Sequence, residues 1–213
     1  MHDRSDPHAN AHMLHAGVPI DEARLVVILL HGRGASAEGI LGLSREIRAS
    51  DLAFLAPQAA GHTWYPQTFL APIPENEPHL GSALRLVATS IADLAGRGVP
   101  AERVALMGFS QGACLSLELA ARHATRYAAV IALSGGLIGP PGTPRDYAGS
   151  LDGTPVFIGC SDVDAHIPLE RVHESTAVLR RLGASVDERI YPGMGHTITR
   201  DELDAVDTLL AER

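Results

Sequence analysis

The sequence predicts an α/β domain in which a mainly parallel central sheet is covered by helices on both faces. Three observations support this prediction. Apolar runs of strand length alternate with longer stretches of helical periodicity. The strand-length runs show no polar alternation, as expected for strands that are buried on both faces. The chain has 213 residues, of which 46% are hydrophobic and 4% aromatic, so an aliphatic core of ordinary domain size can form.

Six short apolar runs are the strand candidates. They lie at 24–30, 52–56, 104–107, 128–133, 156–159 and 186–191. The first run, RLVVILL, is rich in branched aliphatic side chains, which favour buried strands. The last run is the most polar of the six, so we expect it near an edge of the sheet.

Five stretches between these runs have the apolar spacing of helices. They lie at 36–49, 78–94, 111–123, 168–182 and 199–210. The fourth is followed by Gly183, a residue suited to the left-handed position after a helix. The fifth opens with Thr199 and has Glu202 three residues later, which is the spacing of a capping box. Two proline-rich loops, 57–78 and 139–155, are long enough to shape a substrate entrance.

We expect one domain at 21–213, preceded by a flexible arm at 1–20. The arm is polar and carries four histidines, His2, His8, His12 and His15. It holds no apolar block of the length that a secretory signal needs. No run of about 18 apolar residues occurs along the chain, so stable membrane insertion is not expected. These features predict a cytoplasmic protein.

Three features of the composition exclude classes of function: the net charge, the cysteines and the histidines. Seventeen basic and 25 acidic residues give a net charge of −8, which argues against nucleic-acid binding. Cys114 and Cys160 lie far apart, and we expect two buried thiols rather than a disulfide. The eleven histidines include no HExxH and no Cys/His cluster. We therefore expect neither a metal nor another cofactor.

The strongest motif is the run Gly108-Phe109-Ser110-Gln111-Gly112 between a strand and a helix of small residues. This GxSxG pattern in that context is typical of a nucleophilic serine in the α/β-hydrolase fold. The serine must sit on a sharp, strained turn, and side chains two positions either side would collide with neighbouring elements. The helix that follows directs its N-terminal N–H groups at the site, which favours a developing oxyanion. The alternative is an ordinary helix-capping serine in a glycine-rich turn.

The loop His31-Gly32-Arg33-Gly34 after the first strand is the candidate for the rest of an oxyanion hole. In this fold one N–H comes from the residue after the nucleophile, here Gln111, and another from such a loop. We therefore expect the main-chain N–H groups of Arg33 and Gln111 to bind the oxyanion, and His31 to hold the loop. A phosphate-binding loop is the alternative, but the segment lacks both GxGxxG and the P-loop lysine.

The fold requires the chain order serine, acid, histidine. His196 lies in a glycine-rich loop between the last strand and the last helix, where a general base is expected. His166 is the weaker alternative, and His173 falls on the amphipathic helix as a surface residue. Asp162 and Asp164 both follow the fifth strand, and both can act as the acid that orients the imidazole.

With these segments, the chain resembles the phospholipase/carboxylesterase family of small α/β-hydrolases, which includes acyl-protein thioesterases. LHGRG, GFSQGA, GCSDVDAHIP and GMGH stand in the family's order. The resemblance implies Asp164 as the triad acid, because the family's aspartate lies four residues before a proline, here Pro168. It also implies an α/β-hydrolase fold with a minimal cap, and a homodimer at the level of the family. Cys114 is expected to face away from the elbow.

The resemblance implies a serine esterase that cleaves small-molecule carboxylic esters through an acyl-enzyme. The loop QTFLAPIPENEP differs from the eukaryotic protein thioesterases and favours short to medium acyl chains. Trp64, Phe69, Leu70 and Ile73 are expected to line the acyl pocket, with packing of the loop on the body as the alternative. Lysophospholipase or acyl-protein thioesterase activity is the second interpretation. A non-catalytic ligand-binding protein on the same fold is the third.

Overall fold

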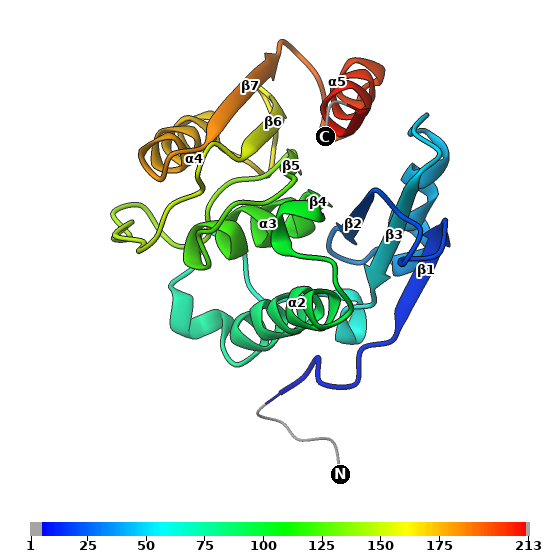
Figure 1. The fold of residues 1–213 in the computed structure, drawn as a ribbon. Helices are drawn as coiled ribbons and strands as arrows, with labels where there is room; N and C mark the ends of the chain where they lie inside the picture. Colours follow the sequence, from blue (N-terminus) through cyan, green and yellow to red (C-terminus); the bar gives the residue numbers. More distant parts are fainter. Residues whose placement is uncertain (1–5, 212–213) are drawn as a thin grey trace.

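The computed structural model describes residues 6–211, which form a seven-stranded sheet in the order β1-β3-β2-β4-β5-β6-β7 (Figure 1). Only β1 is antiparallel to its neighbour, and every other pair of strands is parallel. The strands are β1 (Met13–Gly17), β2 (Leu25–Leu30), β3 (Leu52–Pro57), β4 (Val104–Phe109), β5 (Ala129–Leu133), β6 (Pro155–Ser161) and β7 (Ser185–Tyr191). The predicted mainly parallel sheet is confirmed, with the more polar β7 at one edge.

Helices cover both faces of the sheet, as predicted. They are α1 (Ala37–Leu41), α2 (His79–Gly96), α3 (Gln111–Arg122), α4 (Leu169–Arg181) and α5 (Arg200–Ala211). Successive residues of a strand point to opposite faces, and β2 divides accordingly. Val26, Ile28 and Leu30 join one apolar cluster with α2, α3 and α4. Leu25, Val27 and Leu29 join the other cluster with α1 and α5.

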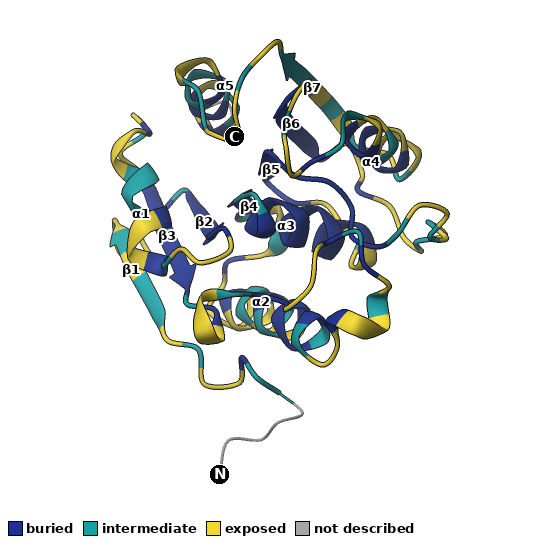
Figure 2. Cartoon of the chain, turned by 180° about the vertical axis from the view of Figure 1, so that it is seen from behind, coloured by how far each residue is buried: buried dark blue, intermediate teal, exposed yellow. Residues whose placement is uncertain are grey.

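Burial follows this layered order. In Figure 2 the inner strands and α3 are buried along most of their length, whereas α2, α4 and α5 present exposed residues on their outer sides. All six residues of β2 are buried, and β1 has no buried residue. No helix within residues 6–211 is long and apolar enough to cross a membrane.

The N-terminal region differs from the prediction of a flexible arm at 1–20. Residues 1–5 lie outside the described part of the chain, but 13–17 form β1, which pairs with β3 from Met13↔Pro57 to Gly17↔Ala53. The segment before it packs on the body, where His8 is 1% exposed. The prediction was wrong because a five-residue edge strand with partly exposed side chains carries no clear apolar signal. The domain therefore begins before residue 21.

The ends of the last two helices confirm the capping predictions. Gly183 has φ +87°, and the N–H of Ala184 donates to the carbonyl of Leu179 at 3.0 Å, as in a Schellman motif. The N–H of Thr199 donates to Glu202 at 2.7 Å, and the N–H of Glu202 donates to the Thr199 hydroxyl at 3.2 Å. The predicted helix at 36–49 is shorter than expected: α1 ends at Leu41 and a 3₁₀ turn follows, in a segment weakened by glycine at two positions.

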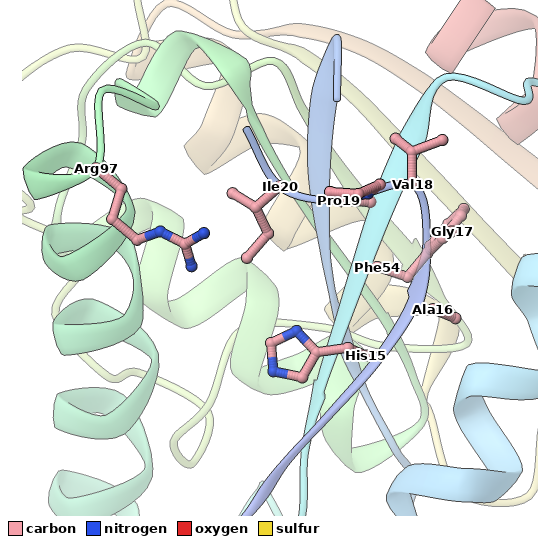
Figure 3. A pocket seen from close by; sticks show the side chains of 9 residues that line it. His15, Ala16, Gly17, Val18, Pro19, Ile20, Phe54 and Arg97 are labelled. Carbon is pink, nitrogen blue, oxygen red and sulfur yellow. The ribbon is translucent and has the colours of Figure 1, made fainter. Parts of the chain in front are cut away.

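One surface hollow lies beside β1 (Figure 3). It has a volume of about 460 Å³ and is lined by β1, the loop after it, β3 and Arg97. His15 and Arg97 point toward the same space, and Arg97 is paired with Asp21 at 3.0 Å. This hollow contains none of the residues that the sequence motifs single out.

Candidate active site

Ser110 occupies a strained turn between β4 and α3. Its backbone has φ 55° and ψ −118°, a conformation that non-glycine residues rarely adopt. A Cβ on Gly108 would lie 2.3 Å from the carbonyl carbon of Gly112, and a Cβ on Gly112 would lie 2.0 Å from the oxygen of Leu30. Both positions therefore require glycine, because the backbones of three elements are in direct contact. The turn has the local geometry that the GxSxG motif predicts.

The structure brings Ser110, His196 and Asp164 into one hydrogen-bonded line. The Oγ of Ser110 lies 2.8 Å from Nε2 of His196, and Nδ1 of the same ring lies 2.7 Å from Oδ2 of Asp164. Because the carboxylate can only accept, Nδ1 carries the proton and Nε2 accepts from the serine hydroxyl. This is the arrangement that a serine nucleophile, a general base and an orienting acid need.

Asp164 is held as an anion. Its side chain is fully buried, and its Oδ1 accepts the backbone N–H groups of His166 at 2.8 Å and Ile167 at 3.0 Å. Burial alone would raise the pKa of Asp164, but the hydrogen bonds from His196 and from these two N–H groups outweigh it and hold the pKa below its ordinary value. The anionic carboxylate accepts the Nδ1–H of His196 and so fixes the orientation of the ring.

The alternative acid and bases have other partners. Asp162 accepts the N–H of Gly193 at 2.8 Å and so anchors the loop that carries His196. The ring of His166 makes an edge contact with the ring of His196, with centroids 4.8 Å apart. His173 is exposed and pairs with Glu188 at 2.9 Å. Among the three histidines that follow β6, only His196 has a hydrogen bond to Ser110 in the described structure.

His31 fixes the peptide that precedes the Arg33 nitrogen. The N–H of Ala59 donates to Nε2 of His31 at 3.1 Å, so the ring proton is on Nδ1, which donates to the Gly32 carbonyl at 2.8 Å. In a trans peptide the N–H points opposite to the carbonyl. The N–H of Arg33 is therefore directed away from the His31 ring. Burial lowers the pKa of His31, which keeps the ring neutral in this role.

The side chains of Arg33 and Gln111 both hold the loop at 63–67, a role that the sequence did not indicate. Gln111 accepts the N–H of Trp64 at 2.9 Å and donates to the carbonyl of Tyr65 at 2.8 Å. Arg33 donates to the carbonyl of Pro66 at 2.8 Å and also to that of Gln67. Two residues whose backbone N–H groups are the predicted oxyanion donors thus carry side chains that brace the same loop.

Ser110 opens into a cavity of about 450 Å³. The cavity is lined by Gly32, Arg33, Ala35, Thr68, Phe69, Phe109, Ser110, Gln111, Cys114, His166, Ile167 and His196. Both predicted oxyanion residues and two members of the hydrogen-bonded line therefore border one space. The aromatic and aliphatic residues give the cavity an apolar wall, and the imidazole of His196 is hydrogen-bonded to Ser110 within it.

Only one of the four residues predicted for the acyl pocket lines this cavity. Phe69 does so, but Trp64 is fully buried and its indole N–H donates to the carbonyl of His31 at 2.8 Å. Leu70 and Ile73 are half-buried and pack against the core cluster. The prediction failed because the loop turns inward at Trp64, whose indole finds its hydrogen-bond partner in the core.

The position of Cys114 also differs from the prediction. It is 1% exposed, as a core residue should be, but it lines the cavity instead of facing away from the elbow. Residues four apart lie on one side of a helix, so the face of α3 nearest Ser110 includes Cys114. Burial raises the pKa of its thiol to about 12, which keeps it neutral. Both cysteines are free and buried, as predicted.

Further lining residues were missed by the sequence analysis, among them three that adjoin the motif residues. Phe109, His166 and Ile167 all border the cavity. Phe109 is the variable residue before the serine in the motif, and the other two follow Asp164. Their adjacency to the motif residues was the available signal, since neighbours of a residue on a tight loop share its surroundings.

A family model described as Phospholipase/Carboxylesterase matches residues 15–212. Acyl-protein thioesterase 1 of Neurospora crassa is 30% identical over 125 residues, covering 54% of this chain and 48% of that protein. Acyl-protein thioesterase 1 of Saccharomyces cerevisiae is 24% identical over 219 residues, covering 90% and 93%. The chain thus spans about half the length of the first relative. A phospholipase/carboxylesterase structure from Dyadobacter fermentans has a TM-score of 0.91 at 41% identity, covering 95% of this chain and 97% of that chain.

Proposed function

Because the chain belongs to the phospholipase/carboxylesterase family, we propose that it is a serine hydrolase that cleaves carboxylic esters through an acyl-enzyme on Ser110. The observation that supports this most directly is the hydrogen-bonded line of Ser110, His196 and Asp164 beside an open cavity. A capping serine would need neither an imidazole on its hydroxyl nor a strained backbone.

In the proposed mechanism His196 acts first as a base. Its Nε2 takes the proton from Ser110 while Oγ attacks the ester carbonyl, and Asp164 stabilises the resulting imidazolium. The main-chain N–H groups of Arg33 and Gln111 hold the negative oxygen of the tetrahedral intermediate. His196 then gives its proton to the leaving alcohol. Water, deprotonated by the same ring, releases the carboxylic acid and returns the serine.

The cavity favours a small or medium acyl group. Phe69 and Ile167 form an apolar wall, and the volume of about 450 Å³ limits the acyl chain that the cavity can enclose. An acyl chain is stabilised by the apolar area that it buries, so its gain ends where the cavity ends. Thioesters are the second candidate substrates, because two matched relatives are named acyl-protein thioesterase and the same acyl-enzyme chemistry serves a thiolate leaving group.

Covalent labelling and a substrate panel test the proposal. A fluorophosphonate probe should label Ser110, and Ser110→Ala should lose labelling and on the order of 10⁴-fold or more in kcat for a p-nitrophenyl ester. Ser90→Ala, which removes a hydroxyl on α2 outside the cavity lining, is the matched control. A wild-type protein that is neither labelled nor active on any ester would contradict the proposal and favour a non-catalytic binding protein.

Graded acyl chains separate the substrate classes. We expect kcat/KM to be higher for acetyl and butyryl esters than for palmitoyl esters, because a long chain outgrows the cavity. Acyl thioesters of the same chain lengths should be measured in parallel. A preference for palmitoyl thioesters would replace the small-ester interpretation with the thioesterase one.

A further inference from the structure

The segment 6–12 packs against the loop at 58–67, although it precedes the residues matched by the family model. Polar contacts with α2 hold this segment in place. Asp6 accepts from the Ser82 hydroxyl and pairs with Arg85 at 3.2 Å, and the backbone N–H of His8 donates to the same hydroxyl at 2.8 Å. A short polar segment at the start of the chain is thus fixed in one place.

Both ring nitrogens of His8 make hydrogen bonds to the backbone of that loop. The N–H of Ala60 donates to Nδ1 of His8 at 3.0 Å, so the ring proton is on Nε2, which donates to the carbonyl of Trp64 at 3.0 Å. The ring is 1% exposed and contacts the indole of Trp64, with centroids 5.6 Å apart. Within residues 6–211, the His8 ring is the hydrogen-bond partner of both backbone groups.

Trp64 connects this contact to the candidate active site. Its N–H donates to Gln111 at 2.9 Å, and its indole N–H donates to the carbonyl of His31 at 2.8 Å. Gln111 carries one proposed oxyanion N–H, and His31 orients the peptide that carries the other, on Arg33. Three buried hydrogen bonds on one residue therefore join His8 to both proposed donors.

We propose that His8 is a positioning residue for the oxyanion hole, acting through Trp64 on the N–H groups of Arg33 and Gln111. This inference rests on the proposed function. Oxyanion donors must lie about 2.7–3.1 Å from the negative oxygen, and small displacements of such a site weaken it. Without the His8 ring, the carbonyl of Trp64 and the N–H of Ala60 lose these partners. We expect the loop then to shift to another hydrogen-bonding arrangement. The contacts of Trp64 with Gln111 and with His31 shift with it.

Three variants test this role. His8→Ala removes both ring hydrogen bonds. His8→Gln offers one donor and one acceptor on a side chain of similar reach, so it should restore the two bonds. His12→Ala is the matched control, because His12 lies in the same segment but is exposed. For each protein, kcat and KM for a p-nitrophenyl ester should be measured, with kcat normalised to the number of Ser110 hydroxyls titrated by a fluorophosphonate probe.

We expect His8→Ala to lower kcat per titrated Ser110 on the order of tenfold, a part of the hundredfold or more that loss of one oxyanion donor costs. KM should be nearly unchanged, since the oxyanion forms only in the transition state. His8→Gln should recover most of the rate, and His12→Ala should match the wild type.

Normalisation separates this role from a merely structural one, which would lower stability and the titratable fraction but leave kcat per site unchanged. That result, or failure of His8→Gln to recover the rate, would overturn the inference. Failure of the proposed function would instead be seen in the wild type, as absence of labelling and of ester hydrolysis.

Discussion

The two sides of the candidate site are built in opposite ways. On one side, side chains from three loops contact one another, and the side chain of His196 is 19% exposed. On the other side, the proposed oxyanion donors are backbone groups, and buried side chains brace their surroundings: Gln111 is 5% exposed, and His31 and Trp64 are fully buried.

This difference separates two tasks. Proton transfer needs a ring that can reach both the serine and the leaving group, so its loop stands at the surface and is tied by single contacts such as Asp162 to Gly193. Charge stabilisation needs dipoles that do not move when the charge appears, so they are tied into the core. We therefore expect substitutions on the proton-transfer side to change rate alone, and those on the oxyanion side to change rate and stability together.

Among the substitutions that compare the two sides, the largest effect is expected from Asp164→Asn. An asparagine can still accept the N–H groups of His166 and Ile167, but its amide would favour the wrong tautomer of His196. We expect kcat to fall on the order of 10⁴-fold with little change in the temperature of unfolding. Asp162→Asn, which can still accept the N–H of Gly193, is the control. Near-normal kcat in Asp164→Asn would remove the orienting role from this carboxylate.

A smaller loss of rate, joined to a loss of stability, is expected from Gln111→Ala. The backbone N–H of residue 111 remains, but the N–H of Trp64 loses its partner inside the protein, while the carbonyl of Tyr65 keeps only the hydroxyl of Thr63 at 3.0 Å. One unsatisfied buried N–H costs about 1–3 kcal/mol in the free energy of unfolding. Urea unfolding and kcat should both be measured, with Gln67→Ala as the exposed control on the same loop. Unchanged stability would show that the oxyanion side is not braced as described.

The smallest effect concerns the pH dependence of stability. Burial lowers the pKa values of both His8 and His31 below the ordinary value of 6.5. The folded state then binds fewer protons than the unfolded chain just below that pH, so the free energy of unfolding should decrease as the pH falls from about 7 to about 5. Asp6 favours the charged form of His8, and His79 and His31 oppose it. For His31, Glu38 favours the charged form and His62 opposes it.

Urea unfolding across that range tests the effect, with His8→Gln compared to the wild type. The variant lacks one of the two titrating rings, so its stability should vary less with pH. The lowered pKa of Asp164 has the same sign but acts below its ordinary value of 3.8, outside this window. A wild-type protein whose stability stays level or rises toward pH 5 would contradict the neutral assignment of the two rings.

The sequence identified the reactive side of the site better than the supporting side. Ser110 and His196 lie within local motifs, and each motif encodes its own turn. The role of His8 depends on Trp64 and Ser82, which are 56 and 74 residues away in the chain. No local pattern contains such a pairing. Trp64 was misplaced for the same reason, because a tryptophan in a polar loop has the same local sequence whether it faces a cavity or the core.

Strands with long apolar runs were predicted from the sequence, whereas a strand with a weak apolar pattern was missed. β2 and β4 stand out because both of their faces are buried. β1 was missed because it lies at an edge and gains its place from pairing with β3, not from its own composition. The end of α1 was misjudged because helical spacing continues past Leu41, where the backbone has already tightened into a 3₁₀ turn.

The contact of Gly112 with the oxygen of Leu30 has a consequence for engineering this protein. The backbone of α3 packs directly against the backbone at the end of β2 at this point. The separation between the start of α3 and the His31–Gly34 loop therefore does not depend on a side-chain rotamer. The cavity wall at Phe69 and Ile167 can accordingly be redesigned for new acyl groups while that spacing is inherited unchanged.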